Sequence, residues 1–224
     1  MAAHLLGGKL APFGLSVSFL RKPLAVVRDT IRAWRCDELH QTIEESGPIA
    51  FPECVTRLEP LEAPWTTEVL VDSGDWTTYL NNGIDGGDPT AAASYLGTRL
   101  ECDCVMGMHV PPNASGHQAT QLWLSGPDGV PPLMSKRTIS ATAEDGHWSW
   151  IVTGEPQPWE HVDRYAARRV RQRFDRPLLV EYLAAIGIHV DDDAFYGGGV
   201  CVRQVVTFAR RQETAAQVRA RFGW

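Results

Sequence analysis

The stretch LMSKRTISATAEDGHWSWIVT, residues 133–153, carries the clearest fold signal in the chain. Its two arms, 133–143 and 147–153, are both typical of β-strands, and Glu144-Asp145-Gly146 lies between them. An Asp-Gly pair in this position predicts a hairpin, because both residues tolerate the positive φ angles of a tight turn. The sequence therefore predicts antiparallel strand pairing in this part of the chain.

Strands elsewhere follow the same pattern. The segments 68–71 and 76–80 flank a short loop that contains Gly74, which predicts a second hairpin. Alternating or continuous apolar residues predict further strands over 15–20, 102–110, 120–125 and 200–208. Hairpins dominate, and strands do not alternate regularly with helices. We therefore expect an α+β fold, mainly an antiparallel sheet of about seven strands packed by helices.

Helices are predicted where apolar residues recur every three or four positions. The predicted helices cover 23–34, 37–45, 90–100, 159–174, 176–186 and 213–222. Asp88-Pro89 and Asp175 are expected to cap two of them, because an Asp side chain accepts from free N–H groups at a helix start. The 224 residues are expected to form one α+β domain, residues 1–224, in which residues 1–50 could be a helical appendage.

Composition excludes several classes of protein. The hydrophobic fraction of 44% and the charged fraction of 21% are those of a globular chain and not of a disordered one. Five irregularly spaced cysteines predict free thiols in a reducing compartment. No stretch has the length and polarity of a signal peptide or membrane helix. We therefore expect a cytoplasmic protein that does not bind a membrane.

No motif for catalysis stands out. The chain contains no P-loop, no dinucleotide-binding glycine motif, no nucleophile elbow and no zinc-protease motif. The Cys102-Asp103-Cys104 pair lacks a second pair of thiols, and the acidic loops lack the spacing of a calcium site. We therefore predict no metal, no cofactor and no catalytic residues.

Charge is distributed unevenly along the chain. From Asp37 to Asp88 there are twelve acidic residues and one basic residue, Arg57, within a chain of net charge −6. Aromatic side chains among carboxylates are suited to a basic protein partner, because the ring contributes buried area and the charge speeds encounter. The leading hypothesis is a non-enzymatic intracellular inhibitor of the immunity or antitoxin kind. Its predicted partner-binding residues are Trp65, Trp76, Tyr79, Glu59, Glu62, Glu68, Asp72 and Asp75.

Two alternatives remain open. The first is an enzyme with a non-standard site for an anionic small molecule, built from Asp85, Asp88, His109, His147, Arg164, Arg168 and Arg171. The second is nucleic-acid binding through the arginine-rich segment 164–176, which the acidic net charge disfavours. For that segment we favour a different arrangement, in which its arginines pair with the acidic stretch 37–88 and neutralise it.

Overall fold

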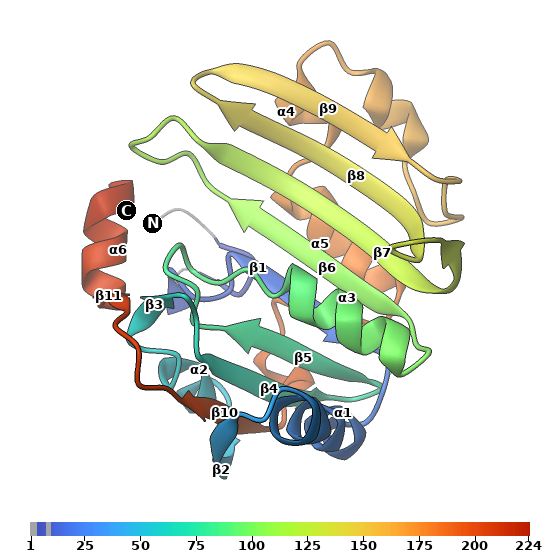
Figure 1. Ribbon diagram of the computed structural model, residues 1–224. Coiled ribbons are helices and arrows are strands. Elements are labelled where there is room, and N and C mark those ends of the chain that lie inside the picture. Colours follow the sequence, from blue (N-terminus) through green and yellow to red (C-terminus); the bar gives the residue numbers. More distant parts are fainter. Residues whose placement is uncertain (1–3, 8–9) are drawn as a thin grey trace.

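The computed structural model describes residues 4–7 and 10–224 (Figure 1). The strands are β1 (Ser16–Leu20), β2 (Thr42–Ala50), β3 (Leu61–Ala63), β4 (Thr67–Ser73), β5 (Trp76–Asn81), β6 (Cys104–Val110), β7 (Gln118–Val130), β8 (Ser135–Glu144), β9 (His147–Thr153), β10 (Gly198–Val205) and β11 (Arg211–Glu213). The α-helices are α1 (Leu24–Arg32), α2 (Glu53–Thr56), α3 (Thr90–Arg99), α4 (Val170–Arg173), α5 (Arg176–Ala185) and α6 (Ala215–Phe222).

One large antiparallel sheet organises the described chain. Its nine strands follow the order β2-β10-β4-β5-β1-β6-β7-β8-β9, and β11 pairs with β3 in a separate small sheet. The predicted α+β fold with a mainly antiparallel sheet is therefore confirmed, with more strands than expected. The hairpins β4–β5 and β8–β9 form where the turn residues predicted them.

Helices cover both faces of this sheet, as Figure 1 shows. Val17 and Phe19 of β1 belong to the larger apolar core, which also contains buried residues of α2, α5 and α6. Leu20 directly follows Phe19, so its side chain lies on the opposite face, where it packs in a second core with α1 and α3. Strand β1 is the middle strand of the sheet, and helices cover it on both faces. All five of its residues are therefore buried.

The described part of residues 1–50 does not form a helical appendage. Strand β1 lies between β5 and β6 in the middle of the sheet, and β2 forms one of its edges. The predicted helix over 37–45 is wrong, because a π-helix (Ala33–Glu38) extends α1 and residues from Thr42 onward pair with β10. The partner of β2 is β10, which is distant in sequence. The local pattern of apolar residues could therefore not show that residues 42–50 form a strand.

The predicted helix over 159–174 is also wrong. The segment contains a 3₁₀ turn (Val162–Ala166), an extended stretch and the single turn α4. Ala167 and Arg169 have extended ψ angles of 140° and 125°, which interrupt any continuous helix. In the described part of the chain, no helix has the length and apolar character needed to cross a membrane.

Candidate functional site

The eight residues predicted to bind a partner do not form one surface. Glu62, Glu68, Trp76 and Tyr79 are buried, and Trp65 is half-buried. Only the remaining three are exposed: Glu59, Asp72 and Asp75. The expectation that the indoles and carboxylates face solvent together is therefore wrong for the buried four, because the sheet and its helices enclose them.

Three of these residues surround one buried guanidinium. Arg35, on the π-helix, donates to a carboxylate oxygen of Glu68 at 2.9 Å, and the Tyr79 hydroxyl donates to the same oxygen at 2.6 Å. The guanidinium carbon lies 4.0 Å from the ring centre of Trp34 and 5.0 Å from that of Trp65. Burial and the Glu68 carboxylate raise the pKa of Tyr79 well above its ordinary value. This cluster holds α1 against the sheet and is not available to a partner.

Glu62 is also buried inside the protein. Its carboxylate accepts hydrogen bonds from Thr66 and, at 2.7 Å, from Gln212, and lies 3.5 Å from the guanidinium of Arg210. These contacts fasten the small β3–β11 sheet to the start of β4. Here a basic residue from far along the chain lies beside one carboxylate of the acidic stretch.

A groove with a volume of about 700 Å³ lies between the edge strand β2, strand β10 and the short helix α2. Of the eight predicted residues, Glu59 is the one that lines it. The groove is lined by Glu44, Glu45, Ser46, Glu53, Thr56, Arg57, Glu59, Thr67, Cys201 and Arg203. Four carboxylates thus face two guanidiniums, which makes the groove acidic.

The carboxylates in the groove differ in how far they are neutralised. Glu45 accepts two hydrogen bonds of 2.8 Å from Arg32, which reaches it from α1. Glu53 lies 3.6 Å from Arg57, but both side chains are exposed, so the attraction is screened by water. Among the described residues, the side chain of Glu44 forms no ion pair and no hydrogen bond, although its backbone lies opposite Arg203 in the β2–β10 pair. Its carboxylate is therefore free to meet an incoming cation.

Glu59 closes the groove at the end of α2. One of its carboxylate oxygens accepts from the backbone N–H of Ala215, the first residue of α6, at 2.9 Å. An anion beside a helix N-terminus is stabilised by the partial positive charge there. Sequence reasoning selected Glu59 and missed Glu44, Glu45 and Glu53. Those three lie in the same acidic stretch but before Glu59, farther along the chain from Trp65 and Trp76.

The residues proposed for an anionic ligand are not brought together. His109 shares a hydrogen bond of 3.0 Å with Thr120, whereas Asp85 pairs with Arg221 at 2.9 Å. Strand register places His109 on the same sheet face as Trp150, and His147 on the opposite face. The predicted set therefore does not form one site.

The arginine-rich segment does not reach the acidic stretch either. Within the described residues, the ion pairs of segment 164–176 are those of Arg164 with Asp175 and of Arg176 with Asp191. The predicted pairing with residues 37–88 is therefore wrong. Arg168 and Arg171 are exposed, and the interrupted helix prevents them from sharing one regular face with Arg164.

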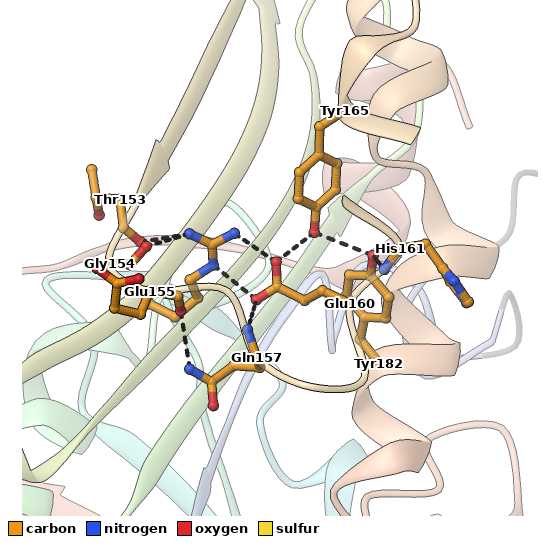
Figure 2. Close-up of polar contacts among 9 residues, drawn as sticks. Thr153, Gly154, Glu155, Gln157, Glu160, His161, Tyr165 and Tyr182 are labelled. Carbon is orange, nitrogen blue, oxygen red and sulfur yellow. Dashed lines mark hydrogen bonds and ion pairs between the residues drawn. The ribbon is translucent and has the colours of Figure 1, made fainter. Parts of the chain in front are cut away.

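A buried ion pair instead anchors the beginning of this segment (Figure 2). Arg137 of β8 donates to both oxygens of Glu160, at 2.8 and 2.6 Å, and also contacts the carbonyl oxygens at the end of β9. Glu160 further accepts from the backbone of Gln157 at 2.8 Å and from the hydroxyl of Tyr165 at 2.9 Å. In this cluster of described residues, no buried side-chain N or O atom lacks a hydrogen-bond partner, which is typical of a structural network.

A second cavity, of about 440 Å³, lies between Trp76 and Trp159 near the end of α5. Arg21 and Lys136 line its rim, and both contact the same carboxylate, Asp103, at 3.9 and 2.8 Å. Lys136 also lies 3.7 Å from the carboxylate of Asp128, so each of the two cations already has a carboxylate partner of its own chain. In the described chain, no group of three or more His, Cys, Asp or Glu side chains could hold a metal ion.

Comparison of the chain with protein-family models, with curated proteins and with solved structures yields no match. The acidic groove is therefore interpreted from its own geometry and charge.

Proposed function

We propose that this protein is a non-enzymatic binding protein whose acidic groove takes up a basic segment of a partner protein. The observation that supports the proposal is the groove of about 700 Å³ with four glutamates against two arginines. A concave site with an excess of one charge raises the local concentration of oppositely charged groups and speeds their association. Arginine or lysine side chains of a partner fit this chemistry.

The finer proposal is an intracellular, cytoplasmic inhibitor of the immunity or antitoxin kind, which covers a basic site on its target. All five cysteines are free thiols, four of them buried, which suits a reducing compartment. Burial raises the pKa of Cys54 to about 11 and that of Cys104 to about 12, so both thiols remain protonated and unreactive. These thiols support a structural and not a catalytic role.

Charge reversal in the groove tests the proposal. The variant Glu44→Lys/Glu53→Lys replaces two exposed carboxylates on facing walls. We expect it to bind a fluorescent deca-arginine peptide at least about 10-fold more weakly than the wild type, measured by anisotropy at low ionic strength. Raising the salt concentration should remove most of the difference, since the attraction is electrostatic.

The matched control is Glu101→Lys/Asp163→Lys, which makes the same change in net charge at two exposed residues outside the groove. It should bind the peptide like the wild type. A pull-down from the source organism, performed with all three proteins, extends the test to the natural partner. Loss of peptide binding in the control to the same degree as in the groove variant would show that the groove is not the site.

A further inference from the structure

Strand β9 leaves one edge of the large sheet without a partner strand. It is the last strand in the sheet order and pairs with β8. In the part of the chain that the structure describes, the backbone of β9 makes hydrogen bonds to no other strand or loop backbone. None of its seven residues is buried. The outer row of N–H and C=O groups is therefore open to pairing.

The geometry of the β8–β9 turn determines which residues of β9 direct their backbone N–H and C=O groups away from β8. Asp145 and Gly146 have positive φ angles of 49° and 79°, as in a two-residue hairpin loop. The flanking pair Glu144–His147 is then a hydrogen-bonded pair, and such pairs alternate along an antiparallel ladder. Trp148, Trp150 and Val152 consequently direct their backbone groups outward.

The two edges of the sheet differ in chemistry. The opposite edge strand, β2, contains two glutamates and a Gly-Pro step, TIEESGPIA. Charged residues and proline at an edge are the usual protection against unwanted strand pairing. Strand β9, HWSWIVT, contains no Asp, Glu, Lys, Arg or Pro, and Ile151 is 52% exposed. An edge of this kind is suited to pairing with another strand.

We propose that β9 pairs with β9 of a second copy of this chain, antiparallel about a two-fold axis at Trp150. Trp150 then lies opposite its own copy, and Trp148 lies opposite Val152. All three are residues whose backbone groups face outward, so the register forms about six backbone hydrogen bonds. An aromatic residue opposite a β-branched one is a favourable cross-strand pair. The strand is therefore complementary to itself.

The proposed register is also favourable for the side chains on the opposite face of β9, those of Ser149 and Ile151. Ser149 lies opposite Ile151 of the second copy, so the exposed Ile151 side chain becomes covered. No charged side chains are opposed, although each chain carries a net charge of −6. Figure 1 shows β9 and β2 at opposite ends of the sheet, so the acidic groove of each copy remains accessible. Dimerisation thus stands independently of the proposed function.

A lysine substitution tests the interface. Ile151→Lys places two like charges on diagonal positions across the two-fold axis, a separation of about 7–8 Å. Val205→Lys is the matched control, because Val205 is similarly exposed, at 49%, on the non-edge strand β10. By sedimentation velocity from 1 to 200 μM, wild type and Val205→Lys should dimerise, and Ile151→Lys should remain a monomer. A wild type that is monomeric throughout, or an Ile151→Lys dimer of unchanged affinity, would overturn the proposal.

Cross-linking tests the register itself. In a Cys36→Ser background, Ser149→Cys/Ile151→Cys places thiols directly opposite each other in the dimer, within the range that a disulfide spans. Mild oxidation should give a covalent dimer on a non-reducing gel. Ser149→Cys alone, whose thiol faces Ile151, should give much less. Equal cross-linking of the two proteins would contradict the proposed register.

Discussion

Buried ion pairs neutralise two carboxylates of the acidic stretch, Glu62 and Glu68, and hold separate segments together. Arg35 binds Glu68, and Arg210 lies beside Glu62. Sequence reasoning could identify the acidic residues but not these partners, because Arg35 lies two positions before the stretch and Arg210 is far along the chain. A charge count over a window cannot show which charges meet in space.

The Arg137–Glu160 pair is expected to be costly to break on one side. Glu160→Leu leaves a buried guanidinium without its carboxylate, which should lower the free energy of unfolding by about 3–5 kcal/mol. Arg137→Met/Glu160→Leu removes both charges and should cost less than Glu160→Leu alone. Urea unfolding followed by tryptophan fluorescence measures both values.

Arg171→Met, at an exposed arginine of α4, is the control for lost charge and should change stability by less than about 0.5 kcal/mol. A double variant that is less stable than Glu160→Leu would contradict this explanation, because it would show that the packing of the two side chains matters more than their charges.

At the scale of elements, predictions succeeded where a local signal determines the structure. Asp145-Gly146 adopts the positive φ angles that its hairpin needs, and Asp175 caps α5 through the N–H of Leu178 at 3.1 Å. The predictions failed where contacts between residues distant in sequence determine the structure. The examples are the segment 159–174, which Glu160 holds against β8, and the strand β2, which pairs with β10. The same reason explains why the acidic groove was not predicted: its walls come from β2, α2 and β10.

The Asp175 cap permits a prediction for one helix. Asp175→Ala removes the acceptor for Leu178 and should lower the free energy of unfolding by about 1 kcal/mol. Asp175→Asn keeps an acceptor in place and loses only the exposed ion pair with Arg164, so it should retain most of the stability. Denaturant melts of the two variants check this. Equal losses would indicate that the ion pair, and not the cap, stabilises α5.

For the whole molecule, two histidines should make stability depend on pH. Burial, followed by the charge of Arg176, lowers the pKa of His4 to about 4 and that of His109 to about 4, from an ordinary value of 6.5. The ring of His4 also packs against that of Trp224, 4.6 Å away, so the N-terminal segment meets the last residue. Folding therefore keeps both rings neutral.

Because these pKa values are lower in the folded state, their stabilising contribution is complete above pH 6.5 and is lost as the pH falls towards 4. Urea unfolding at pH 7, 6, 5 and 4.5 should show this decline. His109→Gln should weaken the dependence, whereas His147→Gln, at an exposed position, should leave it unchanged. A His109→Gln profile identical to that of the wild type would rule out His109 as a contributor.

The position of β10 has a consequence for synthesis on the ribosome. This strand separates β2 from β4, although both of its neighbours precede it by more than 120 residues of chain. Until residues 198–205 leave the exit tunnel, β4 lacks a partner strand on one side and β2 has no partner strand at all. This third of the sheet can therefore close only after synthesis has passed residue 205, and a chaperone that shields β4 until then would favour correct assembly.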